Sequence, residues 1–420
     1  MAVPDAPTGF GIPVEFFLFT LTLLGVALFH QRAMEIALTS AVVTALYKIL
    51  FSAFSGGIGV AGFLHHLGHE WVILVNLFAL LMGFELLSRH FSESHVPAAL
   101  PRFLPGDWKG GFVLLVLVFV MSAFLDNIAA AIIGGTIAAT VFQRRVHIGY
   151  LAAIVAASNA GGAGSVIGDT TTTMMWISGI PPLQVVEAAL GALVALMIFG
   201  IPASIKQHTY SPILKDEAPG NRIDWARVGV VALILGAAIA VNLLLNMHYR
   251  VYADAFPFIG AAVWAALLIA APLRRPDWTA LPEAFRGSVF LVALVLCASM
   301  MPVEHLPHAS WTTALVLGFV SAVFDNIPLT ALALKQGGYD WGFLAYAVGF
   351  GGSMIWFGSS AGVALSNLYP EARSVWQWLC HGWPVVVAYV AGFVVMLTVI
   401  GWHPREPVEK MPAIAVSVQK

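Results

Sequence analysis

The chain has 420 residues, of which 59% are hydrophobic and only 10% are charged, and its net charge is −2. A soluble domain carries about 25% charged residues, so this composition excludes an ordinary soluble protein, and no basic excess indicates nucleic-acid binding. Uncharged stretches close to the ~20 residues that cross a hydrocarbon core recur along the chain, at 188–205, 228–247 and 255–273. The composition therefore predicts an all-α polytopic membrane protein.

The first half of the chain is predicted to cover residues 13–205, after a polar N-terminal lead at residues 1–12. Its apolar stretches predict spans at 13–29, 33–53, 71–88 and 183–205. We expect a solvated loop from Ser55 to Glu70, because no carboxylate or thiol constellation joins its three histidines into a metal site. Residues 89–109 contain three prolines and are predicted to be a surface segment with a short interfacial helix.

A re-entrant hairpin is predicted at residues 110–142, with Asp126 and Asn127 at its tip. Each arm has about 15 residues, or ~23 Å of helix, which is too short to cross a ~30 Å core. The alternative is one continuous span with a polar middle. A single span would separate Lys109 from Arg144 and Arg145, which share one side of the membrane only if the chain turns back.

Residues 148–179 are predicted to form a broken helix. Gly161, Gly162 and Gly168 interrupt it, and Asp169 and four threonines, Thr170 to Thr173, follow. Glycines and hydroxyl residues make a poor continuous helix. Within a membrane, unwound backbone persists only where it is buried in protein or lines a cavity. We therefore expect a binding site at this break.

The polar stretch 206–227 is predicted to be a cytoplasmic linker, followed by a second half at 228–400 and a C-terminal tail at 401–420. The second half repeats the plan of the first. Its spans are predicted at 228–247, 255–272, 287–302 and 376–400. A hairpin at 309–336 has Asp325 and Asn326 at its tip, and a broken helix at 341–370 contains Gly351, Gly352, Ser359 and Ser360.

Matched landmarks indicate an internal duplication. Asp126 and Asn127 recur at a constant offset of 199, and Gly161 and Gly168 recur at an offset of 190. Each half is predicted to contain five spans, one of them the broken helix, plus one hairpin. Because five is odd, the second half enters the membrane with the opposite orientation. Inverted-topology repeats of this kind are typical of secondary transporters, whose binding site lies near the midplane at discontinuous helices.

The placement of Lys and Arg supports this topology. With the first hairpin opening to the cytoplasm, 14 of the 20 basic residues lie inside, five lie outside and Lys48 lies within a span. Both termini are then predicted to lie outside the cytoplasm.

Asp126, Asp169 and Asp325 are the candidate ion-binding carboxylates, because an acid within the membrane is costly and marks an ion pathway. The simpler interpretation is that each aspartate caps a helix, and the two roles can coexist. Asn127 and Asn326 add amide oxygens, and the unwound segments add hydroxyl and backbone oxygens, the ligands that Na⁺ requires. A carboxylate buried beside others can also hold a proton near neutral pH and exchange it for a cation.

The predicted site is asymmetric, because the position that corresponds to Asp169 in the second half is Ser359. We therefore expect the ion on the side of Asp126 and Asp169, with Asp325 as a second titrating group. Glu85 and His90, at the end of the third span, are candidates for a proton relay or for ordinary anchors at the membrane edge. The two cysteines have no disulfide or metal-ligand spacing.

At these residues the chain resembles the NhaD-type sodium/proton antiporters. That family belongs to the ion transporter superfamily, with the arsenite and citrate or dicarboxylate transporters. The matching patches include Ser158 to Gly162, Ile167 to Asp169, Leu125 to Asn127, Asp325 to Leu329 and Gly351 to Ser353 with Gly358 to Val363.

The resemblance implies exchange of Na⁺ or Li⁺ for H⁺ in a bacterial inner membrane or an organelle derived from one, two inverted repeats and a scaffold that often forms a homodimer. It implies no cofactor and no enzymatic activity. The ion or substrate site that it implies comprises Asp126, Asn127, Asn159, Gly161, Gly162, Asp169, Thr170, Thr171, Asp325, Asn326, Gly351, Gly352, Ser359 and Ser360.

Four other functions are weighed against antiport. A citrate or dicarboxylate transporter is disfavoured because Asp at both tips would repel an anion, whereas neutral arsenous acid would tolerate the carboxylates. A membrane-embedded enzyme is disfavoured because the Asp169–threonine run supplies no nucleophile, base and orienting group. A non-transporting scaffold would not need three acids within the membrane.

Overall fold

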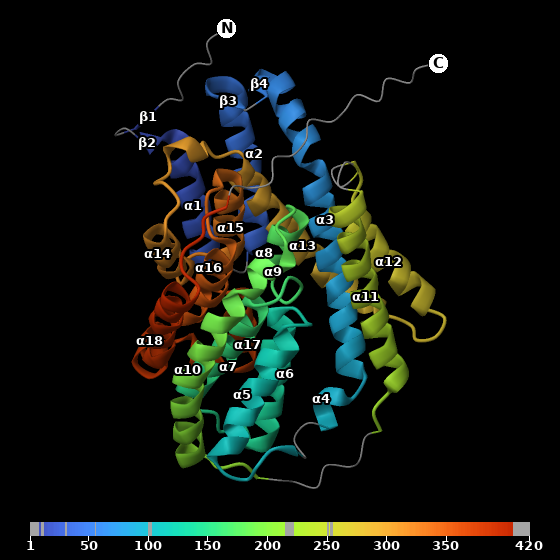
Figure 1. Cartoon of the computed structure of the whole chain (residues 1–420), viewed down its shortest axis with the longest axis vertical. Helices are drawn as coiled ribbons and strands as arrows, with labels where there is room; N and C mark the ends of the chain where they lie inside the picture. The colour runs from blue at the N-terminus through green and yellow to red at the C-terminus, as the bar shows by residue number, and fades with distance from the viewer. Residues whose placement is uncertain are drawn as a thin grey trace.

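The structure is a computed structural model that describes residues 8–9, 12–29, 32–54, 56–99, 103–214, 222–249, 252 and 255–405. Residues 1–7 of the predicted lead, 215–221 of the predicted linker and 406–420 of the predicted tail lie outside the described residues. The described chain is almost entirely helical (Figure 1). Its strands form two short antiparallel pairs, Thr8–Gly9 (β1) with Ile12–Pro13 (β2) and Ala53–Phe54 (β3) with Gly57–Ile58 (β4).

The helices before the predicted linker are Val14–Leu28 (α1), Ala33–Phe51 (α2), Gly59–Glu93 (α3), Val96–Ala99 (α4), Trp108–Ser122 (α5), Asn127–Val141 (α6), Ile148–Ala163 (α7), Thr170–Ile177 (α8), Pro182–Val186 (α9) and Ala188–Tyr210 (α10). Those after it are Trp225–His248 (α11), Phe258–Ala270 (α12), Leu281–Ser299 (α13), Trp311–Ser321 (α14), Asn326–Gln336 (α15), Trp341–Ala345 (α16), Ser360–Leu368 (α17) and Val375–Val399 (α18). Single turns of other helix types complete them, at Trp278–Ala280 (η4), Val303–His305 (η5), Tyr346–Phe350 (η6), Gly352–Met354 (η7) and Pro370–Arg373 (η8).

Among the residues that the structure describes, six helices are long and apolar enough to cross a membrane. They are Ala33–Phe51, Gly59–Glu93, Pro182–Tyr210, Trp225–Leu245, Trp278–Ser299 and Val375–Val399. With the shorter apolar helices packed between them, they make the chain an all-α, multi-pass membrane protein.

Helix α3 is longer than the sequence predicts, and the predicted loop from Ser55 to Glu70 is wrong. The helix begins at Gly59 and extends beside α11 and α12 through much of the molecule (Figure 1). His66, predicted to be solvated, is only 5% exposed, and its Nε2 lies 3.0 Å from the Ser299 hydroxyl at the end of α13. A polar residue can continue a helix into the interior when another helix supplies a hydrogen-bonding partner, and sequence spacing does not reveal that partner.

The predicted hairpins and broken helices correspond to pairs of short helices. Asp126 lies between α5 and α6, and Asp325 lies between α14 and α15. Helix α7 ends at Ala163, and α8 begins after Asp169. The second interruption consists of the single turn of π-helix η6, the 3₁₀ turn η7 and a bend before α17.

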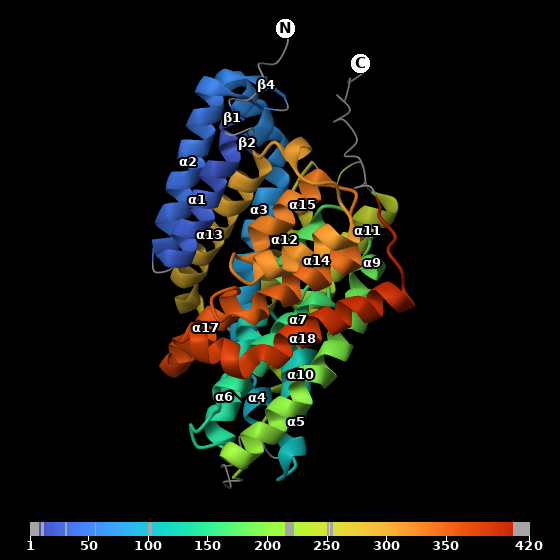
Figure 2. The same cartoon turned by 90° about the vertical axis from the view of Figure 1, so that its left-hand side faces the viewer.

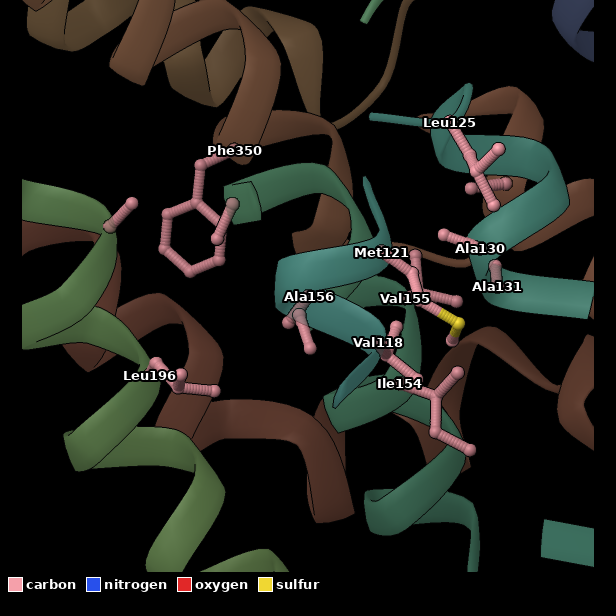
Figure 3. Packing of buried hydrophobic residues seen from close by; sticks show 14 of the residues in the cluster. Val118, Met121, Leu125, Ala130, Ala131, Ile154, Val155, Ala156, Leu196 and Phe350 are labelled. Atoms are coloured by element: carbon pink, nitrogen blue, oxygen red, sulfur yellow. The ribbon is translucent and has the colours of Figure 1, made fainter. Parts of the chain in front are cut away.

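The core surrounds the first interrupted pair. Helices α5, α6, α7 and α10 contact one another through closely packed apolar residues, several of which Figure 3 shows from close by. Those that are labelled include Val118, Met121, Ala130, Ala131, Ile154, Val155, Ala156, Leu196 and Phe350. Small residues in α6 and α7 bring the helix backbones close together, as is common between helices in membranes.

One glycine in each broken helix fixes the distance between that helix and the preceding hairpin. A Cβ atom on Gly161 would lie 2.1 Å from the carbonyl oxygen of Phe119 in α5. A Cβ atom on Gly351 would lie 2.3 Å from the carbonyl oxygen of Gly318 in α14. Since backbone atoms cannot move aside as a flexible side chain can, only glycine fits at these two positions.

The start of the second half is held by ion pairs outside the membrane core. Asp224 caps α11, and its carboxylate accepts hydrogen bonds from Arg274 at 2.8 and 3.3 Å. The hydrogen bonds from the Arg274 guanidinium hold the pKa of Asp224 below its usual value. The neighbouring Arg227 pairs with Glu93 at the end of α3, at 2.6 Å. Helix α10 continues to Tyr210, so residues 206–210 of the predicted linker are helical.

We expect Gly351→Ala to destabilise the protein by about 1–3 kcal/mol, because the added methyl group meets backbone and forces α14 and η7 apart. Gly236→Ala is the matched control, since a Cβ atom there has no neighbour within 4 Å. Alanine in an exposed helix should be neutral or stabilising by up to about 1 kcal/mol. Thermal unfolding in detergent measures both variants, and equal melting temperatures would contradict the packing argument.

Candidate functional site

The tip aspartates cap the second arm of each hairpin. The Asp126 carboxylate accepts a hydrogen bond from the backbone N–H of Ile128 at 3.2 Å, and Asp325 accepts one from Ile327 at 3.0 Å. Asp325 also accepts a hydrogen bond from the Ser360 hydroxyl at 3.4 Å. Both aspartates remain partly exposed. The capping interpretation is therefore correct for both residues, and each carboxylate keeps further lone pairs with which to contact a cation.

Asp169 lies between the two tips. It caps α8 by accepting a hydrogen bond from the N–H of Thr171 at 3.2 Å, and it is only 2% exposed. Its other carboxylate oxygen lies 3.3 Å from the amide nitrogen of Asn326 in the second hairpin. The carboxylates of Asp126 and Asp325 are both near enough to interact electrostatically with that of Asp169. The fold thus brings together three acids that are far apart in the sequence.

These acids do not converge on a single point. Within the described part of the chain, no three His, Cys, Asp or Glu side chains gather closely enough to hold a metal ion. A cation bound here would need amide, hydroxyl or backbone oxygens beside a carboxylate. Such a mixed oxygen set suits a weakly held, exchangeable ion better than a permanent metal centre.

Asn159 joins the two halves of the chain. Its amide oxygen accepts a hydrogen bond from Asn127 at 3.1 Å, and its amide nitrogen donates to the hydroxyls of Ser353 at 3.0 Å and Ser359 at 2.9 Å. Ser359 in turn caps α17 by accepting from the N–H of Gly362. All of the polar atoms in the Asn159 side chain therefore have protein partners, which favours a structural role for it between the two broken helices.

One buried hydroxyl near the first tip lacks such a partner. Among the described residues, the Ser122 hydroxyl at the end of α5 has no hydrogen-bond partner, although Ser122 is fully buried. Ser321, which corresponds to Ser122 at the offset of 199, donates to the carbonyl oxygen of Val348 at 2.8 Å. A buried hydroxyl without a partner is unusual in a native protein, and its oxygen remains free to contact another group.

The remaining residues of the predicted site belong to the two helix interruptions. Gly161, Gly162 and Thr170 flank the gap between α7 and α8, and Gly351 and Gly352 lie between η6 and α17. Their contacts are mainly those of close backbone packing.

The sequence analysis did not select Ser353 or Gly349 for the site. Gly349 belongs to the π-helical turn η6, and a Cβ atom on it would lie 3.3 Å from the Asp169 carboxylate. The offset of 190 pairs Gly349 with Asn159. This correspondence is the sequence signal that could have pointed to Gly349. It pairs a glycine with an asparagine, so the two predicted repeats differ at this position as well.

Glu85 and His90 lie on the long helix α3 and not at the tips. Glu85 forms an ion pair with Arg89 at 3.1 Å and interacts electrostatically with Asp126. His90 is buried, and its Nδ1 lies 3.1 Å from the guanidinium of Arg227. Glu85 is therefore placed to influence the first tip, whereas His90 belongs to the ion-pair network at the start of α11.

No family model matches the chain. Comparison with known proteins does find relatives. The chain is 27% identical over 342 residues to Sodium/proton antiporter 1 of Arabidopsis thaliana, which covers 71% of the chain and 56% of that relative. It is 25% identical over 308 residues to Sodium/proton antiporter 2 of Arabidopsis thaliana, which covers 62% and 69%. It is 26% identical over 333 residues to Na(+)/H(+) antiporter NhaD of Vibrio parahaemolyticus, which covers 67% and 77%.

The chain thus spans just over half the length of the first of these relatives. Relatives from two kingdoms are named as antiporters, which are transporters and not enzymes. The resemblance predicted from the hairpin tips and the broken helices is confirmed: several relatives are named as sodium/proton antiporters, NhaD among them, and they support an NhaD-type antiporter family.

Proposed function

We propose that the protein is a secondary active transporter that exchanges Na⁺ or Li⁺ for H⁺. In this proposal, the cation and the proton compete for intramembrane carboxylates by alternating access. The names of the relatives support the reaction class. The three acids at interrupted helices support the mechanism, because a carboxylate in a site with little water can bind either a proton or a cation, but not both.

We further propose that the two halves, residues 13–205 and 228–400, are inverted repeats of five spans and one hairpin. Asp126 and Asp325 cap matched helices, and so do Asp169 and Ser359. Helix α6 contacts α17 and α15 contacts α8, so each hairpin meets the second part of the opposite broken helix. This reciprocal contact is what a two-fold pseudosymmetry axis through the site would produce.

The same proposal places the protein in a cell inner membrane with both termini outside the cytoplasm. The distribution of Lys and Arg supports that orientation. We propose a homodimer as the assembled form, on the resemblance to the family alone.

The ion is proposed to bind on the side of Asp126 and Asp169. The single observation that supports this placement is the difference between Ser122 and Ser321. The Ser122 hydroxyl has no partner among the described residues, whereas the matched Ser321 hydroxyl is satisfied by Val348. Ser359, which corresponds to Asp169, is likewise held by the Asn159 side chain. The Ser122 position therefore offers an unused oxygen, whereas the corresponding serines of the second half are closed by protein hydrogen bonds.

In the exchange cycle, Na⁺ entry displaces a proton from the Asp126–Asp169 pair, and a proton returning from the other side displaces Na⁺. Asn127 and Asn326 can supply amide oxygens once their own contacts loosen, and Asp325 serves as the second titrating group. Glu85, which shares the electrostatic field of Asp126, is the proposed proton relay. His90 is held by Arg227, so we propose that it affects exchange only through α3 and α11.

Asp126→Asn, Asp169→Asn and the double change Asp126→Asn with Asp325→Asn should each lower exchange activity at least tenfold, because an amide binds neither a proton nor a cation as a carboxylate does. Asn is as good an N-cap as Asp, so thermal stability should change by less than about 0.5 kcal/mol. Asp107→Asn is the matched control, since Asp107 caps α5 but lies exposed. Full exchange activity in the double variant would contradict the assignment.

Everted vesicles that contain the protein should respond to Na⁺ and Li⁺ with dequenching of a pH-sensitive dye, because cation entry releases protons from the loaded interior. Vesicles without the protein are the control. A response to citrate or arsenite but not to Na⁺ or Li⁺ would replace the proposed substrate. A response to none of these solutes would favour a non-transporting scaffold.

Ser122→Ala should raise the Na⁺ concentration for half-maximal exchange about tenfold, equivalent to about 1.4 kcal/mol, because it removes one proposed ligand oxygen. Ser321→Ala is the matched control at the corresponding position. It should leave Na⁺ dependence unchanged and lower stability by about 1 kcal/mol through loss of its hydrogen bond. Equal Na⁺ dependence in the two variants would show that the ion does not favour the Asp169 side.

A further inference from the structure

A cavity with a mainly apolar lining lies between α10 and α18 at the start of α7. Its volume is about 190 Å³, and its lining includes Lys206, His381, Trp383 and Gly149. The backbone builds this cavity. Pro202 in α10 and Pro384 in α18 both line it, and proline inside a helix removes a hydrogen bond and bends the axis. Figure 2 shows α18 crossing α10 in this region.

The cavity has a positive charge that no acid neutralises. The ammonium group of Lys206 lies 3.3 Å from Nδ1 of His381, and the His381 ring centre lies 4.9 Å from that of His147. Among the described residues, no carboxylate forms an ion pair with Lys206, His147 or His381. Burial, and then the charges of Lys206 and His381, lower the pKa of His147 to about 4. The Nδ1 atom of His147 accepts a hydrogen bond from the N–H of Gly149 at 3.0 Å, so this ring is a neutral cap of α7. Lys206 is therefore the positive charge beside the cavity, and an anion would stabilise it.

Further residues extend this basic cavity into a rim. The Arg145 guanidinium lies 5.8 Å from the ring centre of Tyr210, and the Tyr210 ring packs against His147. The Gln207 side chain accepts a hydrogen bond from the N–H of His147 at 2.7 Å and donates to the carbonyl of Arg145 at 3.0 Å. This hydrogen-bonded frame fixes the loop before α7 against the end of α10. The basic groups are therefore held in place and are not isolated surface side chains.

The surroundings indicate a lipid as the source of the anion. Trp383, beside the cavity, is 60% exposed, and Trp376 on the same helix is 76% exposed. Leu379 and Val387 of α18 are exposed as well. Exposed tryptophans are typical of the membrane–water interface, and apolar residues next to a basic pocket can contact acyl chains. Basic pockets between helices on the cytoplasmic side are known to bind acidic headgroups, and both Lys206 and Arg145 are predicted to lie on that side.

We propose that this cavity binds the phosphate of an anionic phospholipid headgroup, with Lys206 and His381 as the residues that contact it. The bound headgroup pairs with the Lys206 ammonium, which also contacts His381, and clamps α10 against α18. Trp378, three residues before His381 in α18, donates from its indole N–H to the carbonyl of Ser353 at 3.4 Å. Ser353 also accepts from Asn159. The lipid would therefore support the same broken helices as the transport site, although its binding does not depend on the transported ion.

The test uses purified, delipidated full-length protein in a neutral detergent, with thermal unfolding measured after each addition. Phosphatidylglycerol should raise the melting temperature, and phosphatidylcholine should raise it much less. Lys206→Gln and His381→Gln should each weaken the apparent affinity for phosphatidylglycerol about tenfold, whereas Lys109→Gln should not. Lys109 is a matched control because it is exposed on the same predicted side and pairs with Asp107.

Three results would overturn the proposal. The first is equal stabilisation by phosphatidylcholine, which would indicate binding through the acyl chains alone. The second is the same stabilisation by inorganic phosphate at matched concentration, which would indicate a soluble anion. The third is full stabilisation by phosphatidylglycerol in both variants. Because the variants lie on different helices, a folding defect in one leaves the other to decide the question.

Discussion

A helix that stops inside a membrane exposes backbone N–H groups that no water can satisfy, and this constraint shapes the centre of the protein. Asp126, Asp169, Asp325 and Ser359 each cap such a helix start. Three of the four caps are carboxylates. The carboxylates that stabilise the interrupted helices can therefore also bind a proton or a cation. An Asp→Asn change removes the charge but keeps the cap, so the two roles can be separated.

The difference between the two halves matters as much as their similarity. The hairpin tips are alike, but Asp169 corresponds to Ser359, Asn159 to Gly349 and the unpartnered Ser122 to the hydrogen-bonded Ser321. Asn159 crosses between the halves and satisfies both Ser353 and Ser359. The corresponding positions thus cap their helices in the same way, while their side chains differ in charge and in hydrogen bonding.

Packing between the helices limits how this centre can move. Gly161 and Gly351 place each broken helix against the backbone of its own hairpin, so a hairpin and its broken helix would move together. Each hairpin also contacts the second part of the opposite broken helix. The centre is consequently joined through close backbone contacts, and the long helix α3 contacts it at α8.

The sequence alone determined the membrane class, the helical content and the four polar interruptions. Low charge and long apolar runs leave few alternatives, and an acid or a glycine cluster inside such a run is conspicuous. The repeat offset also identified the pairs of residues that would correspond. These features are local or periodic, so they can be read without knowing which helices are neighbours.

Only the tertiary structure decided which of those groups meet and which have partners. It extended α3 through the predicted loop because His66 finds Ser299 on another helix. It placed Asn326 on Asp169 and fully satisfied Asn159, and it left Ser122 without a partner in the described part of the chain. Hydrogen bonding between distant segments depends on how the helices pack. The sequence could therefore name the polar residues of the site, but it could not tell a ligand from a structural hydrogen bond.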